Sequence, residues 1–151
     1  MRFFLAGIMQ GSRVEQGLHT QDYRQRLRGL IRECVPEADV YDPLTDHRKS
    51  AEQGANKGRD VFFHHNRMCR EVDALIAFLP EASMGTAIEM WEAHQHGAAV
   101  FTISPLRHNW AVKFLSHALY DSVEQFEQAL RSGQVAELLR AVRSGARPGT
   151  T

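Results

Sequence analysis

The sequence predicts an α/β domain in which a parallel sheet is covered by helices on both faces. Short apolar runs, typical of buried strands, alternate along the chain with longer stretches of helical apolar spacing. This alternation is typical of a doubly wound parallel sheet, and neither an internal repeat nor a linker interrupts it. A chain of 151 residues is long enough to bury one core. We therefore expect a single domain over residues 1–144 and a disordered tail over residues 145–151.

Four apolar runs predict strands, and a weaker fifth segment predicts an edge strand. The clearest run, residues 74–79, is apolar throughout and should be central, with both faces covered. In chain order the others are residues 2–7, 39–41, 99–103 and the edge segment 118–120. Asp42-Pro43 and Ser104-Pro105 end two of them.

Helical spacing predicts the elements between these strands. The expected helices cover residues 20–35, 60–72, 85–96, 109–117, a segment that begins at residue 123, and residues 134–144. Gly97 should end the third of these as a C-cap. Ser122 and Gln125 have the spacing of a capping box. The polar segment 49–58 contains glycine and is expected to be a mobile loop.

Composition narrows the class of protein. Lys plus Arg and Asp plus Glu both number 18, so no overall basic field is present to bind nucleic acid. No apolar run reaches the length needed to span a membrane. Cys34 and Cys69 fall in predicted helices, which is typical of buried thiols in a reducing compartment. A cytoplasmic location is therefore expected.

The segment Pro80–Glu89, PEASMGTAIE, joins the central strand to a helix. Gly85 would let the backbone approach a ligand, and the first N–H groups of the helix could hold a phosphate or a sugar hydroxyl. Glu89 would feel the positive helix end, which favours the carboxylate. An ionised carboxylate beside a sugar can attack the anomeric carbon. A Glu in the first turns of a helix also commonly serves the helix dipole alone, so both interpretations stay open.

Two other loops should lie at the same end of the sheet. GIMQGSR after the first strand could cover a base or a phosphate, with Arg13 as anion partner, although it matches neither GxGxxG nor a Walker loop. Asp42, Asp46 and His47 follow the second strand. A carboxylate there could protonate a leaving base, or DPLTD could simply form a turn.

The histidines do not predict a metal site. His64 and His65 are adjacent and His94 and His96 alternate, so their side chains diverge at about 100° per residue on a helix. Neither pair has the i, i+4 spacing of a zinc-binding helix. We expect no metal and no cofactor, with His94 and His96 solvated near a helix end. Asp73 should be structural, at the far end of the sheet.

The runs SMGTAIEMWEAHQHG and FLAGIMQGSR resemble the nucleoside 2-deoxyribosyltransferase superfamily over about residues 2–120. The resemblance implies a flavodoxin-like fold of about five strands, with Glu89 as the nucleophile. It also implies a small nucleoside or nucleotide substrate, with no nucleic acid polymer and no membrane partner. Relatives are oligomers with shared active sites, so a homodimer or larger homo-oligomer is expected.

Two activities of this superfamily are relevant. Transferases move 2-deoxyribose between nucleobases, and related N-glycosidases hydrolyse 2'-deoxynucleoside 5'-monophosphates. Ser83, six residues before Glu89, matches the phosphate-binding Ser of the hydrolases, where transferases have an Asp. Asn109 in RHNW resembles the transferase Asn that a neighbouring subunit lends to the 5'-hydroxyl. The long Gly-rich tail has no evident match to the functional C-terminal carboxylate of the transferases.

The resemblance implies a set of substrate-binding residues and one departure. The set is Phe4, Gly7, Ile8, Met9, Gly11, Arg13, Asn66, Ser83, Gly85 and Asn109. Both activities usually carry an Asp eight residues before the third-strand Asp73, and here that position is His65. Either His65 has taken the proton-transfer role, or Asp60 or Asp42 serves.

We lead with a transferase that acts through Glu89. The alternatives are the monophosphate N-glycosidase and a non-catalytic nucleotide-binding module, because fold does not determine function. A structural or assembly protein is a further class, because five apolar residues could face a partner or belong to the core. They are Trp91, Phe114, Leu115, Phe126 and Leu130.

Overall fold

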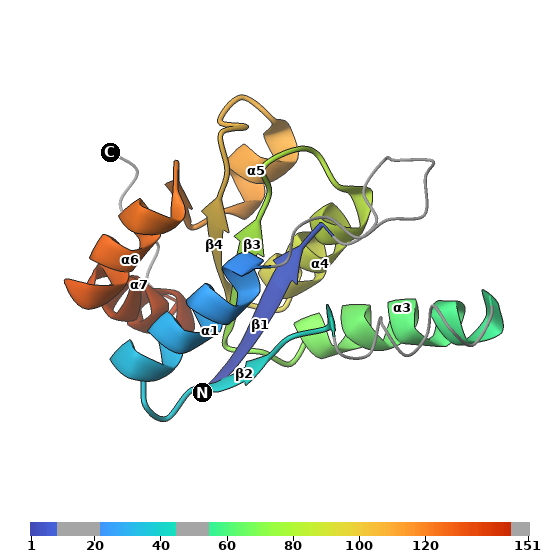
Figure 1. The fold of residues 1–151 in the computed structure, drawn as a ribbon, viewed down its shortest axis with the longest axis horizontal. Coiled ribbons are helices and arrows are strands. Elements are labelled where there is room, and N and C mark those ends of the chain that lie inside the picture. The colour runs from blue at the N-terminus through green and yellow to red at the C-terminus, as the bar shows by residue number, and fades with distance from the viewer. Residues whose placement is uncertain (9–21, 45–54, 146–151) are drawn as a thin grey trace.

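The computed structural model describes residues 1–8, 22–44 and 55–145, and these form one α/β unit (Figure 1). Five parallel strands make a single sheet in the order β2-β1-β3-β4-β5. In chain order they are β1 (Arg2–Gly7), β2 (Asp39–Tyr41), β3 (Ala74–Phe78), β4 (Ala99–Ile103) and β5 (Ala118–Tyr120). The predicted doubly wound parallel sheet is confirmed, including the central position of β3 and the edge position of β5.

Helices cover both faces of this sheet. They are α1 (Asp22–Cys34), α3 (Ala55–Cys69), α4 (Met84–Gln95), α5 (Trp110–Leu115), α6 (Val123–Arg131) and α7 (Gln134–Arg143). Helices α1, α6 and α7 pack on one face, and α3, α4 and α5 pack on the other, as Figure 1 shows. Each face of the sheet therefore has its own apolar cluster.

The two clusters follow from the alternation of side chains along the strands. On β1, Phe3 and Leu5 face α1, whereas Phe4 and Ala6 face the opposite helical layer. All four are at most 1% exposed. Because both faces of the strand are covered, both sets of side chains must be apolar. This explains why the central strands appear in the sequence as unbroken apolar runs.

One predicted loop is partly wrong. The sequence predicts a loop over residues 49–58, but α3 begins at Ala55, and residues 49–54 lie outside the described residues. Lys57 and Gly58 are exposed. A helix end that faces solvent needs no apolar stripe and tolerates a glycine at modest cost, so the sequence shows no helical signal there. The other helix boundaries in the described ranges agree to within about three residues, the largest difference being the end of α3 at Cys69 where residue 72 was expected.

The predicted caps are confirmed. Gly97 follows α4 with a φ of +82°, the left-handed conformation that glycine adopts without strain. The Ser122 hydroxyl accepts a hydrogen bond of 3.2 Å from the backbone N–H of Gln125 at the start of α6. These caps determine where two helices begin or end and thus the register of the packed layers.

The expected solvation of His94 is wrong. Its Nδ1 lies 3.0 Å from the backbone oxygen of Leu115, and its ring stacks on His117 with centroids 5.1 Å apart. His117 Nδ1 accepts a hydrogen bond from the backbone N–H of Val100. Burial, and secondarily His94, lower the pKa of His117. Contacts with Leu115 and His117 therefore leave His94 half-buried, whereas His96 is exposed.

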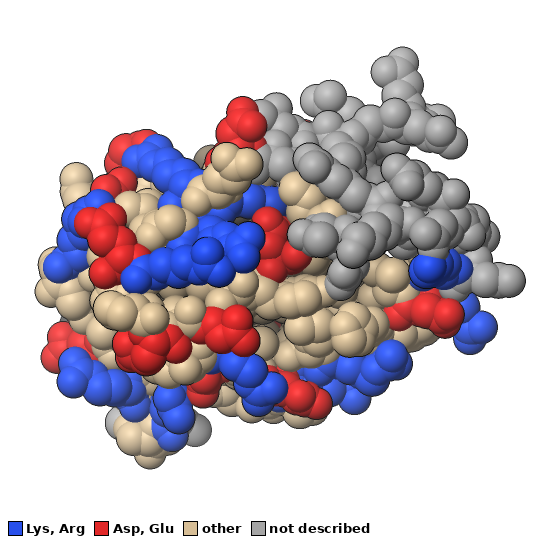
Figure 2. Space-filling model, turned by 60° about the horizontal axis from the view of Figure 1, so that its bottom comes forward, with Lys and Arg blue, Asp and Glu red and all other residues tan. Residues whose placement is uncertain are grey.

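Charged residues of both signs intermingle on the surface, as the face in Figure 2 shows. Arg26 of α1 binds Glu124 and Glu127 of α6, and Arg131 binds Glu33 and Glu127. All but the Arg131–Glu127 pair, which lies within α6, connect α1 to α6 at the protein surface, where each contributes little on its own. The interspersed charges agree with the zero net charge of the sequence.

The strand order places a topological switch point between β1 and β3. The chain leaves β1 toward α1 on one face and leaves β3 toward α4 on the other (Figure 1). Gly7 and Phe78, the last residues of the two strands, are register partners. In open α/β sheets the crevice beyond the carboxyl ends at such a point is the usual ligand site.

Gly7→Ala is expected to destabilise the fold by about 1–3 kcal/mol, because the added methyl overpacks a buried site. A Cβ at Gly7 would lie 2.1 Å from the Tyr23 hydroxyl oxygen and 3.3 Å from the Phe78 carbonyl oxygen. Urea unfolding measures the change. Gly29→Ala is the matched control, because nothing lies within 4 Å of the place that its added methyl would occupy on α1, and it should stabilise by about 0.5–1 kcal/mol. Equal stability of Gly7→Ala and the wild type would contradict the close approach.

Candidate active site

Glu89 lies on the inner face of α4. The buried residues of this helix are Thr86, Glu89, Met90 and Ala93, and Glu89 is 9% exposed. Helix α4 packs against β1 and β3, the two strands that flank the switch point. The helix therefore places one buried carboxyl group in the region where α/β folds bind ligands.

Burial dominates the electrostatics of Glu89. It raises the pKa of this carboxyl to about 8, and the positive charge of Arg24 opposes that rise. Burial therefore opposes the ionised form of Glu89 that the helix end was expected to favour. Glu89 is in the second turn of α4, which begins at Met84, and the helix dipole falls off within the first turn. Desolvation then outweighs what remains of the dipole.

Arg24 is the buried cation of this site. Its side chain is 1% exposed and reaches from α1 to the carboxyl end of β1. Nη1 donates to the Leu5 carbonyl oxygen at 2.9 Å, and Nη2 donates to the Gly7 carbonyl oxygen at 3.2 Å. Nη1 also lies 2.9 Å from Asp42 Oδ1. Arg24 thereby ties α1, β1 and the residue after β2 together.

Asp42, a candidate acid from the sequence, is engaged in this network. Its Oδ1 accepts a hydrogen bond from Arg24 and another, of 3.0 Å, from the backbone N–H of Leu44. The Asp42 carboxylate therefore binds Arg24 and also stabilises the turn that the motif DPLTD predicted. In this arrangement the Asp42 carboxylate serves as a partner of the buried guanidinium.

Tyr23 adds a phenol beneath Gly7. Its ring stacks on Phe78 with centroids 4.1 Å apart, and Arg24 lies 5.3 Å from the ring centroid. The hydroxyl is buried beside the Arg24 guanidinium. Burial, chiefly, raises the pKa of Tyr23 to about 12, and the charge of Glu89 contributes. The phenol is therefore neutral at ordinary pH.

Sequence reasoning missed Arg24 as a site residue, although a signal was present. Arg24, Leu27 and Ile31 follow the i, i+3, i+7 spacing of one helix face, and the latter two belong to the core. An Arg at a core position of an amphipathic helix requires a buried partner. The neighbouring positions of α1 are rich in Arg, so this residue resembles the arginines of the solvent face.

His65 occupies an aromatic cage on the α3 side of the sheet. It is 4% exposed, and its ring meets Phe4 and Tyr41 edge-on at centroid distances of 6.2 and 6.0 Å. Phe4, a predicted substrate contact, has a fully buried side chain that packs against His65. The Ile8 side chain is likewise in the core, at 2% exposure. Asn66 donates through Nδ2 to the Phe62 carbonyl oxygen at 2.8 Å, and its Oδ1 has no partner in the described part of the chain.

The start of α4 has the polar and open features that the sequence suggested. Ser83 is the N-cap, and its hydroxyl oxygen accepts from the Thr86 N–H at 3.3 Å and lies 3.1 Å from the Thr86 hydroxyl oxygen. Gly85 has nothing within 4 Å of where a side chain would begin. Packing therefore does not demand glycine at this position, and the space beside it is open. Asn109 is exposed and caps α5 by accepting from the Val112 N–H at 3.2 Å.

Several predicted positions fall elsewhere. Met9, Gly11, Arg13, Asp46 and His47 lie outside the described residues. Asp60 is exposed on α3.

The opposite end of the sheet holds Asp73, as predicted. Its Oδ2 accepts from the Arg2 N–H at 2.7 Å, so this carboxylate is structural. Within the described ranges, no group of three or more His, Cys, Asp or Glu residues is arranged to hold a metal ion. No helix in the same ranges is long and apolar enough to cross a membrane.

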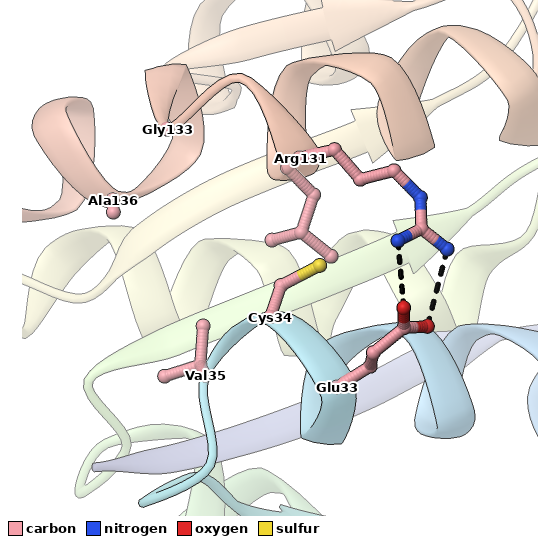
Figure 3. A pocket seen from close by; sticks show the side chains of 7 residues that line it. Glu33, Cys34, Val35, Arg131, Gly133 and Ala136 are labelled. Carbon is pink, nitrogen blue, oxygen red and sulfur yellow. Dashed lines mark hydrogen bonds and ion pairs between the residues drawn. The ribbon is translucent and has the colours of Figure 1, made fainter.

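A pocket of about 340 Å³ lies away from this site, where the end of α1 meets α6 and α7 (Figure 3). Arg131 and Glu33 belong to its lining and are joined by a two-bonded ion pair of 2.8 and 3.1 Å. Cys34, Val35 and Leu130 are among the other lining residues. Because its charges neutralise each other and it lies near the amino ends of the strands, we assign no chemistry to this pocket.

Solved structures of enzymes share this architecture. A 2-deoxyribosyltransferase from the psychrotolerant bacterium Bacillus psychrosaccharolyticus is 17% identical, with a TM-score of 0.66 over 91% of this chain and 96% of that chain. The Clostridium botulinum CMP N-glycosidase BcmB is 19% identical, with a TM-score of 0.50 over 86% and 97% of the two chains. A conserved protein from Enterococcus faecalis V583 is 17% identical over 95% and 98%, with a TM-score of 0.49.

Neither a protein-family model nor a curated protein matches the sequence. At the identities of these solved structures, the likeness shows a common fold. What the chain does with this fold must therefore be argued from its own residues.

Glu89→Gln is expected to stabilise the protein increasingly as pH rises from about 5 to about 8. Because the folded-state pKa is near 8 and an exposed Glu titrates near 4.5, the native state keeps a proton that the unfolded chain releases. Stability of the wild type then falls with rising pH, by at most about 1.4 kcal/mol per unit from this group. Urea unfolding across that range tests it, with Glu92→Gln on the same helix as the control. Parallel pH dependences of wild type and Glu89→Gln would contradict a buried, protonated Glu89.

Proposed function

We propose that this protein is a member of the nucleoside 2-deoxyribosyltransferase superfamily that cleaves the N-glycosidic bond of 2'-deoxynucleosides and transfers the deoxyribosyl group to another nucleobase. The observation that carries the proposal is Glu89, a buried carboxyl group held by α4 beside the switch point of β1 and β3. The fold shared with a 2-deoxyribosyltransferase supports it.

In the proposed reaction, Glu89 is the nucleophile. An oxygen of the ionised carboxylate attacks C1' of the sugar, and the bond from C1' to the base nitrogen breaks with its electron pair on the base. The departing base takes up a proton. A nitrogen of the incoming base then attacks C1', the carboxylate leaves, and the incoming base loses its proton. His65 is the candidate for this proton transfer, because it is buried on the same face of the sheet as Glu89. Asp42, the other candidate, is already bound to Arg24.

The hydrolase alternative rests on Ser83. Its hydroxyl oxygen accepts hydrogen bonds from Thr86, which leaves the hydroxyl hydrogen to donate to a phosphate at the start of α4. In that case water, in place of a second base, resolves the glycosyl-enzyme. The substrate would be a 2'-deoxynucleoside 5'-monophosphate, and the fold shared with a CMP N-glycosidase is compatible with this.

Glu89→Gln is expected to lower turnover at least about 1000-fold, because the amide cannot act as the nucleophile. The protein is incubated with each 2'-deoxynucleoside and each 5'-monophosphate, with and without a second base, and products are separated by chromatography. Glu92→Gln, which alters an ion pair with Arg70 one turn further along α4, should keep activity.

The products discriminate between the candidates. New nucleoside that requires the second base supports the transferase, whereas free base released from monophosphates alone supports the hydrolase. Binding without any turnover would leave a nucleotide-binding module and refute both reactions.

The proposal includes a homodimer formed through α3, α4 and α5. All seven large apolar side chains that are exposed in the described part of the chain lie on these helices: Phe62, Phe63, Met84, Ile88, Trp91, Trp110 and Phe114. The sequence left open whether Trp91 and Phe114 face a partner or belong to the core. They are 53% and 60% exposed. The other residues of that set, Leu115, Phe126 and Leu130, belong to the core. Helix α4 contacts both of its neighbours, so the three helices form one face.

A second copy is the simplest cover for this face. A whole aromatic side chain offers about 150–250 Å², so these residues together approach the roughly 800 Å² that each partner buries in a standard interface. A two-fold axis pairs the same patch with itself. Asn109 immediately precedes Trp110 and caps α5. A dimer through this face would therefore bring Asn109 to the subunit boundary.

Replacing Trp110 and Phe114 together by Ser is expected to raise the dimer dissociation constant at least about 100-fold, because exposed aromatic anchors dominate interface energies. Sedimentation velocity over a concentration series measures it. Arg140→Ser on α7, in the other helical layer, is the control and should remain dimeric. A wild-type protein that stays monomeric at high concentration would refute the interface.

A further inference from the structure

We propose that Arg24 is a positioning residue for the reaction, acting from the opposite face of the sheet as the counter-charge that favours the ionised form of Glu89. The inference rests on the proposed role of Glu89 as nucleophile. Arg24 is on α1 and Glu89 on α4, and these helices flank β1 on opposite faces of the sheet (Figure 1).

The geometry holds the guanidinium in one place. It is bound at the carbonyl oxygens of Leu5 and Gly7 and at Asp42 Oδ1, and its side chain is 1% exposed. A guanidinium is always charged, and its planar fork fits several fixed acceptors. The charge is therefore permanently located at the end of β1, the strand against which the Glu89 helix packs.

Among the described residues, Arg24 is the only buried Lys or Arg. Strands β3 and β4 contain no titratable residue, and the charged residue of α5, Lys113, is exposed. From α3, Cys69 and His65 face inward; burial, chiefly, raises the pKa of the Cys69 thiol, and Glu89 adds to this. Tyr23 is neutral at ordinary pH. In the described part of the chain, Arg24 is the positive group that lowers the pKa of Glu89 against the effect of burial.

The pairing of Arg24 with Asp42 offers a test that depends on the direction in which the pKa of Glu89 shifts. Asp42 is negative and shares the guanidinium, so it weakens the field of Arg24 at Glu89. If the Arg24–Asp42 pair had a purely structural role, removing either partner would lower the stability of the fold to a similar extent. An electrostatic role predicts opposite shifts of the Glu89 titration.

The experiment is a ¹³C NMR titration of the Glu side-chain carboxyls in the full chain, with the Glu89 signal assigned by Glu89→Gln. In Arg24→Met the Glu89 midpoint should rise by at least about one pH unit, a tenfold loss of the ionised form. In Asp42→Asn it should fall below that of the wild type. Arg24→Lys keeps the charge and loses the fork, so it should keep a midpoint near the wild-type value even if the protein is less stable.

The outcomes separate this inference from the proposed function. An unchanged midpoint in Arg24→Met, or shifts of the same sign in Arg24→Met and Asp42→Asn, would overturn the role of Arg24. If Arg24→Met does not fold, Asp42→Asn and Arg24→Lys still decide, because a midpoint that does not fall in Asp42→Asn overturns it equally. The titration needs no turnover. Absence of any glycosidic cleavage with the expected shifts would refute the proposed function and leave the charge coupling intact.

Discussion

The parallel pairing of β1 with β3 at the centre of the sheet is the constraint on which the rest of the structure depends. Because both strands are covered on both faces, their side chains are apolar, and polar groups can gather only beyond their ends. The chain leaves these two strands in opposite directions, which puts α1 and α4 on opposite faces. Arg24 and Glu89 are thereby brought toward one edge of the sheet from two different layers.

The same constraint creates a conflict between stability and chemistry. A nucleophilic carboxylate must be ionised to react, yet the fold holds Glu89 where water cannot solvate its charge. A substrate that fills the crevice would displace still more water. In the proposed reaction, the internal cation would do what solvent does for an exposed carboxylate, without moving. A fixed guanidinium tied to backbone oxygens meets that requirement better than a mobile side chain.

The sequence predicted those features that depend on neighbouring residues. The buried runs of β1, β3 and β4, the Ser122 cap and the left-handed Gly97 follow from local pattern and steric rules. The start of α3 was not predicted from the sequence, because a solvent-exposed helix end carries no apolar periodicity. The charge state of Glu89 could not be inferred, because desolvation depends on which elements cover the residue after folding. Arg24 was visible as an Arg on the apolar stripe, but its acceptors on β1 and after β2 are distant along the chain.

The two outermost strands, β2 and β5, have only three residues each. A short edge presents few unpaired backbone groups, and such edges protect sheet proteins against uncontrolled edge-to-edge association. This protein therefore has little capacity to grow by adding strands from another molecule. The proposed self-association would use helical surfaces instead, where side-chain shape limits the number of partners. Ending the sheet so early on both sides thus favours a finite assembly over a fibre.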